Sequence, residues 1–160
     1  MSFIRFLMLL SLVIWIGGLV FFAFVLAPTV FHPGILPTRQ LAGNVVNRSL
    51  GILHWMAIGC GCVFAVTSMI DSRVAGGSAR PFAVHHLLVY AMIVLTLVSL
   101  FGVSPRMQLL RQQMVTIDAV PRDDARRVEF NRLHVWSTRI EATVLVLGLA
   151  LLYLTARRMG

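Results

Sequence analysis

The residues best able to do chemistry in this chain are a glutamate, two histidines and several polar side chains near long apolar segments. A carboxylate inside hydrocarbon is costly unless it has a partner or a proton, so Glu141 is the strongest indication of a functional site. At 100° per residue on a helix, Glu141 shares a sector of about 80° with three other polar residues. These are Asn131, His134 and Thr138.

A second polar helix face contains Asn47 and His54, which are seven residues apart and therefore nearly aligned on a helix. The two faces together predict a polar pocket bounded by His54, His134, Glu141, Asn47, Asn131 and Thr138. A carboxylate with an imidazole can relay protons or bind a cation, and two facing imidazoles can ligate haem iron or another metal. The alternative is a set of interhelical hydrogen bonds that fixes how the helices pack.

Other kinds of catalytic chemistry find no support in the sequence. It contains no serine-histidine-aspartate order, phosphate-binding loop or zinc-protease motif, and it has no lysine for Schiff-base chemistry. Cys60 and Cys62 are two residues apart, so they fall on nearly opposite faces of a helix and cannot bond to each other. These features favour a role other than that of an enzyme.

The segments that must position the polar residues are long and apolar. Of the 160 residues, 58% are hydrophobic and 12% are charged, and a soluble domain of this size could not bury so much apolar surface. At 1.5 Å per residue, each of four segments covers roughly 30 Å, the thickness of bilayer hydrocarbon. The spans are residues 6–27, 52–70, 82–103 and 135–156. We therefore expect an all-α fold, a multi-pass integral membrane four-helix bundle that forms a single domain over residues 1–160.

Residues 104–134 separate the third and fourth spans and are predicted to form an amphipathic loop. An apolar stripe of Met107, Leu110, Met114 and Ile117 recurs at helical spacing, which suits the membrane interface or docking on the bundle. Asp123 and Asp124 are typical of a helix start, because acidic side chains stabilise the positive end of the helix dipole. The fourth helix is therefore expected to begin before the membrane.

The charge distribution points to lipid and not to nucleic acid. All 14 basic residues are arginines, and with 6 acids the net charge is +8. The arginines flank the apolar segments, as topology signals and contacts to anionic lipid headgroups do. Four spans place both termini on one side. The long-loop side carries eight arginines and the terminal side five, which favours a cytoplasmic long loop. Arg5, ahead of the first span, argues for the reverse orientation, so the sequence leaves the direction open.

Several short motifs carry a family resemblance. The first segment contains Trp15, Gly17 and Gly18 and ends at Pro28, and the fourth opens with Asn131-Arg132-Leu133-His134. With these motifs the chain resembles, over nearly its whole length, the bacterial domain of unknown function 4149 family, which is related to the eukaryotic transmembrane protein 205. The resemblance implies a four-helix protein of the bacterial cytoplasmic (inner) membrane without an established biochemical activity.

Three functions are compatible with these features. The first is binding or passage of a small solute, a metal ion or a proton at the predicted pocket. The second is electron transfer or oxidoreduction by haem b held between His54 and His134; no other cofactor is expected. The third is a structural subunit that packs against another membrane complex. A homodimer would favour the first of these three functions.

Overall fold

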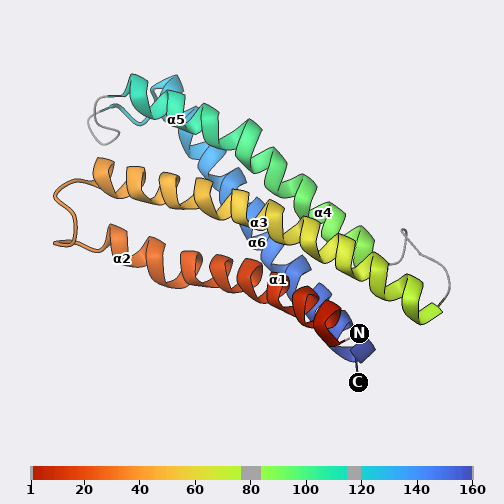
Figure 1. Ribbon diagram of the computed structural model, residues 1–160. Helices are drawn as coiled ribbons and strands as arrows, with labels where there is room; N and C mark the ends of the chain where they lie inside the picture. Colours follow the sequence, from red (N-terminus) through yellow and green to blue (C-terminus); the bar gives the residue numbers. More distant parts are fainter. Residues whose placement is uncertain (1, 77–83, 115–119, 160) are drawn as a thin grey trace.

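The structure is a computed structural model that describes residues 2–76, 84–114 and 120–159. Its helices form four long rods that lie side by side (Figure 1). The first rod contains α1 (Ser2–Phe21), the π-helix η1 (Phe22–Leu26) and α2 (Ala27–Phe31); the second is α3 (Arg39–Gly76). The third contains α4 (Val84–Val98), the π-helix η2 (Ser99–Val103) and α5 (Ser104–Gln113); the fourth is α6 (Ala125–Met159).

Both termini lie at one end of the bundle, here called the terminal end (Figure 1). The opposite end, called the loop end, holds the connection between α2 and α3 together with α5. Each rod is long and apolar enough to cross a membrane: Ser2–Phe31, Arg39–Val74, Val84–Gln113 and Ala125–Arg157. The predicted all-α four-helix bundle is confirmed, and the fold is consistent with an integral membrane protein.

The helices continue beyond the apolar runs that the sequence marks out. Residues 104–113 extend the third rod as α5, and residues 125–134 already belong to α6, so much of the segment predicted as a loop is helical. The reason is packing, because Leu110 and Met114 are buried against Phe130 on α6 in a small apolar cluster. The described part of this apolar stripe therefore docks on the bundle, and Ile117 lies outside the described residues.

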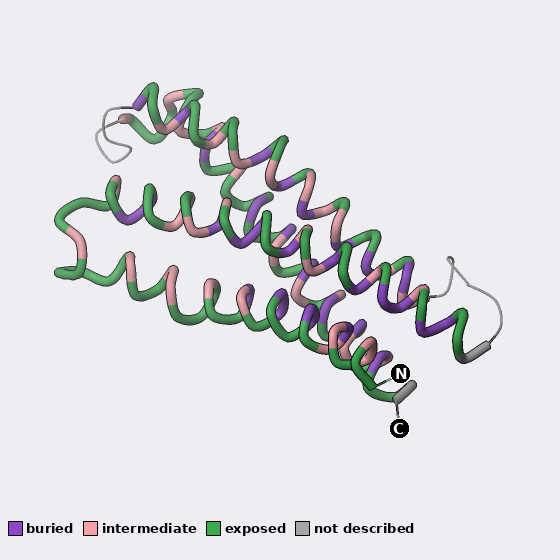
Figure 2. The backbone as a smooth tube through the Cα atoms, viewed as in Figure 1, coloured by how far each residue is buried: buried purple, intermediate pink, exposed green. Residues whose placement is uncertain are grey.

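The centre of the bundle is closely packed and apolar. Its fully buried side chains include Trp15 from α1, Phe64 from α3, Met92 from α4 and Leu151 from α6, so every rod contributes to one core. Buried residues line the inner faces of the rods, and exposed residues occupy the outer faces (Figure 2). Many exposed side chains are large and apolar, which suits a surface covered by lipid.

Small residues allow the helices to approach closely at two points. A Cβ atom added to Gly61 would lie 2.8 Å from Ile93 Cγ1 and 2.9 Å from Trp15 Cζ3. A Cβ added to Gly18 would lie 2.7 Å from Leu53 Cδ1, whereas Gly17 is exposed with nothing within 4 Å. Trp15 and Gly18 of the family motif therefore form helix contacts, as small residues do in membrane bundles.

The two π-helices share a local cause. In η1 the amide N–H of Ala27 donates to the carbonyl of Phe22, five residues earlier instead of four, and η2 closes in the same way. A proline follows each of them by two positions, Pro28 after η1 and Pro105 after η2. Proline lacks an amide hydrogen, and its ring collides with the carbonyl four residues earlier. The wider π turn relieves this conflict, and such turns are frequent at functional sites.

Helix α6 starts with a complete N-cap. Asp124 Oδ1 accepts a hydrogen bond from the amide of Arg126 at 2.8 Å, and the carbonyl of Asp124 accepts one from the amide of Val128 at 3.0 Å. The Arg126 side chain also donates to this carboxylate, and these hydrogen bonds lower the pKa of Asp124 from 3.8 to about 2. The helix start predicted from the acidic pair is therefore confirmed.

The close contact at Gly61 predicts that alanine substitutions at Gly61 and Gly59 have different effects on the stability of the bundle. Gly61→Ala should lower the stability of the bundle by about 1–3 kcal/mol, because the added methyl group overpacks the contact with Trp15 and Ile93. Gly59→Ala is the matched control, since a Cβ there meets nothing within 4 Å and alanine favours helix. Thermal unfolding in detergent, followed by circular dichroism, measures both. Equal melting temperatures for the two variants would contradict this view of the core.

The N-cap predicts a pH-dependent contribution to stability. The pKa of Asp124 is lowered in the folded chain, so its stabilisation is complete above pH 3.8 and is lost as the pH falls toward about 2. Asp124→Ala should therefore melt at a lower temperature than the unmodified chain near neutral pH, and the difference should disappear across this acidic window. Asp123→Ala, which removes the neighbouring exposed acid, serves as the control. A difference that stays constant down to pH 2 would show that the carboxylate charge is unimportant.

Candidate functional site

Glu141 joins three of the four rods through hydrogen bonds. Its Oε1 atom lies 2.7 Å from His54 Nε2, on α3, and accepts a hydrogen bond of 3.1 Å from Ser99 Oγ, the first residue of η2. His54 is 1% exposed, and Ser99 is fully buried. A carboxylate that α6 carries into the membrane is thus supplied with donors by two other helices.

One ring nitrogen of His54, the one that does not contact Glu141, makes no hydrogen bond to the described part of the chain. His54 Nδ1 is buried and has no hydrogen-bond partner among the residues that the structure describes. Each tautomer of the ring leaves this nitrogen unsatisfied, either as a donor or as an acceptor, which costs free energy. The pair is therefore less completely satisfied than a purely structural pair would be.

A cavity of about 520 Å³ lies beside this pair, at the loop end of the bundle. This volume falls within the usual 300–1,000 Å³ of ligand sites. Its wall is mostly apolar and comes from all four rods, with large side chains such as Leu19, Phe22, Phe24, Phe31, Leu50 and Leu145. The polar lining residues are Asn47, Ser104, Arg111, His134, Ser137, Thr138 and Glu141.

The residues predicted as a pocket have different surroundings in the structure. Four of the six line the cavity, namely Asn47, His134, Thr138 and Glu141, and the fifth, His54, contacts Glu141 directly. Asn131 is exposed and is not among the lining residues. The hydroxyl of Thr138 donates to the backbone carbonyl of His134, so it is engaged within its own helix.

His134 does not share the contact that His54 makes with Glu141. His134 is exposed, and its ring stacks on Phe130 with 6.5 Å between centroids. It precedes Glu141 by seven residues, about 10 Å along the helix. In the described part of the chain, no group of three or more His, Cys, Asp or Glu side chains could hold a metal ion. The partner of His54 is thus the glutamate.

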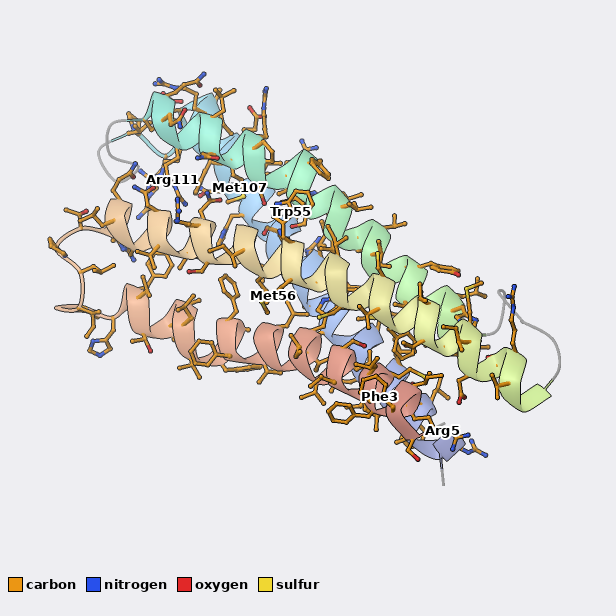
Figure 3. The ribbon with its side chains drawn as sticks, in the orientation of Figure 1. Phe3, Arg5, Trp55, Met56, Met107 and Arg111 are labelled. Atoms are coloured by element: carbon orange, nitrogen blue, oxygen red, sulfur yellow. The ribbon has the colours of Figure 1, made fainter. Side chains whose placement is uncertain are left out.

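Two important residues were not among those predicted for the pocket. Ser99 lies in an apolar run, where a lone serine gives little signal. Arg111 belongs to the arginines that were expected to contact lipid headgroups, yet it is half-buried, lines the cavity and lies over the Phe130 ring at 5.4 Å. Figure 3 shows Arg111 and Met107 at the loop end, between α5 and α3. The inward direction of Arg111 follows from the packing of α5 on its neighbours.

Comparison with known proteins gives one result. The family model described as domain of unknown function (DUF4149) matches residues 10–116, which is two thirds of the chain and includes His54, Ser99 and Arg111. No curated protein and no solved structure matches the chain. The matched segment begins within α1 and passes through α5, the part that supplies three of the four rods. The chain therefore belongs to the DUF4149 family, which its sequence motifs had indicated.

Proposed function

We propose that this protein is a multi-pass protein of the bacterial cytoplasmic membrane that binds a small solute in the cavity at the loop end. We further propose that solute binding is linked to a proton held by the His54–Glu141 pair. One observation carries the proposal: the Glu141 carboxyl group lines the cavity while its Oε1 atom is hydrogen-bonded to both His54 and Ser99.

The coupling has a simple electrostatic basis. The charged form of a carboxyl group is stabilised by donors and by water, and it is disfavoured when apolar groups replace the water. On its protein side Glu141 accepts a hydrogen bond from Ser99 and shares one with His54, and the cavity lies on its other side. A solute that fills the cavity changes the medium next to the carboxyl group, so it changes how strongly the pair holds its proton.

A purely structural role for the pair explains less of the geometry. Hydrogen bonds that fix helix packing do not require an open space beside the carboxyl group. The Glu141 side chain nevertheless keeps 17% of its surface accessible, on the side of the cavity. The other charged or titratable groups that line the cavity are His134 and Arg111, and they provide the comparison for any experiment on Glu141.

The proposal predicts that one proton site controls the pH response of the bundle. In detergent, the melting temperature of the unmodified chain should vary with pH, because the proposal gives the pair a proton that the folded chain can exchange. Glu141→Gln keeps the shape and the hydrogen-bonding capacity of the side chain but cannot ionise, so it should flatten this dependence. His54→Gln should do the same, and His134→Gln, on the cavity wall without a contact to Glu141, should retain it.

Two results would contradict the proposal. Parallel pH curves for the unmodified chain and Glu141→Gln would show that the carboxyl group does not exchange a proton in the pH range measured. A Glu141→Leu variant that is more stable than the unmodified chain, with the same pH response, would show that the pair is a replaceable packing contact.

A further inference from the structure

Arg111 brings to the cavity a positive charge that no acid pairs with among the described residues. Its Nε atom is buried without a hydrogen-bond partner in the described part of the chain, and none of the ion pairs found between described residues includes it. Two other arginines at this end differ, since Arg106 pairs with Glu129 at 2.8 Å and Arg126 with Asp124 at 2.7 Å. A half-buried cation without an acid is costly unless a ligand supplies the anion.

The protein holds this side chain in place and does not leave it free to reach the surface. The guanidinium group packs on Gly43 of α3, where an added Cβ atom would lie 2.9 Å from it and would displace the end of the side chain. The opposite side of the guanidinium lies over the face of the Phe130 ring at 5.4 Å, a cation–π contact. The charge is thus fixed between two helices at the cavity wall.

By the lengths of the apolar runs, the cavity is expected to begin outside the hydrocarbon and to reach into it. Arg111 follows the third apolar run by eight residues, about 12 Å beyond the hydrocarbon boundary expected from residue 103. At the other end of the cavity, Leu145 lies ten residues inside the fourth apolar run, about 15 Å deep. Between these levels the wall is mostly apolar and includes Phe22 and Leu50.

The cavity also opens to the side. Several of its lining residues are exposed, with Phe24 and Phe31 on the first rod and Thr138 and Ala142 on α6. These two rods therefore form a rim on the surface that lipid would cover. A molecule dissolved in one leaflet can enter at this rim without passing through water.

We infer that the cavity binds a single-chain amphiphile with a carboxylate headgroup, a fatty-acid-like molecule taken from one leaflet of the membrane. The inference rests on the proposed function and names its ligand class. The carboxylate is held by Arg111, whose planar guanidinium can donate two parallel hydrogen bonds through Nε and a terminal nitrogen. The alkyl chain lies along the apolar wall, toward the depth of Leu145.

The charges of the cavity set the direction of the ligand. An anionic group at the deep end would face the Glu141 carboxyl group, whereas at the shallow end it neutralises Arg111. A small free anion would leave the apolar wall uncovered, and a neutral alcohol would leave the guanidinium without a counter-ion. Only a molecule with one anionic end and one apolar end satisfies both regions.

Binding of tritiated dodecanoate to the full chain in phosphatidylcholine nanodiscs tests the inference. Arg111→Gln should weaken binding about 10–100-fold, the effect of losing a charge-assisted contact. Leu50→Trp narrows the apolar wall about 10 Å along α3 from Gly43, within reach of a twelve-carbon chain, and should also weaken binding at least about tenfold. Arg106→Gln is the matched control on the same helix, since Arg106 is exposed, pairs with Glu129 and should leave binding unchanged. Arg111→Lys, which keeps the charge without the planar fork, should fall between Arg111→Gln and the unmodified chain.

Competition with unlabelled compounds identifies the outcomes that would overturn the inference. If dodecanol competes as well as dodecanoate, the charge of the headgroup has no role. If acetate competes as well as dodecanoate, the site binds small anions. If dodecyl phosphate competes better than dodecanoate, the headgroup is a phosphate. Unchanged binding in Leu50→Trp would place the ligand outside the cavity. If Arg111→Gln unfolds, the Arg111→Lys result and the competition series decide.

The same assay separates the ligand class from the proton linkage. Dodecanoate itself takes up a proton as the pH falls, and this contribution is common to both chains. Glu141→Gln should still bind dodecanoate at neutral pH, and it should lose the additional variation of affinity with pH that the pair gives the unmodified chain. If the additional variation persists in Glu141→Gln, the proton linkage fails while the ligand class stands. If the unmodified chain does not bind dodecanoate, the ligand class fails and the pH response of the melting temperature still tests the pair.

Discussion

A carboxyl group surrounded by hydrocarbon must find hydrogen-bond donors, and Glu141 finds them on two other helices. His54 from α3 and Ser99 from η2 both contact its Oε1 atom, so three of the four rods meet at one oxygen. Apolar packing alone would allow the rods to rotate or slide with a modest loss, because lipid competes for the same surfaces. A buried polar contact has far fewer acceptable arrangements, so it selects one relative placement of α3, the third rod and α6.

The π-helices adapt the regular rods to this contact. In the third rod the wider turn begins at Ser99, the residue that donates to Glu141, and in the first rod the corresponding turn supplies Phe22 and Phe24 to the cavity wall. Each departure from the α-helix is followed by a proline, Pro28 or Pro105. The backbone irregularities that the prolines impose and the polar site therefore lie at the same part of the bundle.

The two charged groups of the cavity are separated by depth. Glu141 lies inside the apolar segment of α6 and has partners within the protein, whereas Arg111 lies beyond the end of the third apolar run, stacked on Phe130 and facing Gly43. The DUF4149 match covers Arg111, Ser99 and His54, whereas Glu141 and His134 come from the helix beyond it. This arrangement places a guanidinium group at one end of the cavity and a hydrogen-bonded carboxyl group deeper along α6, which is the basis of both proposals.

The sequence by itself determined the four spans, because the length of an uncharged run has to match the thickness of hydrocarbon. It also determined the start of α6 at the acidic pair, which acts through local hydrogen bonds, and the need of Glu141 for a partner, which follows from the cost of a charge in lipid. Only the tertiary structure decided that this partner is His54 and not His134, that Ser99 completes the site, and that Arg111 turns inward. The physical reason is that periodicity tells which residues share a face of one helix, whereas the rotation and crossing of neighbouring helices decide which faces meet.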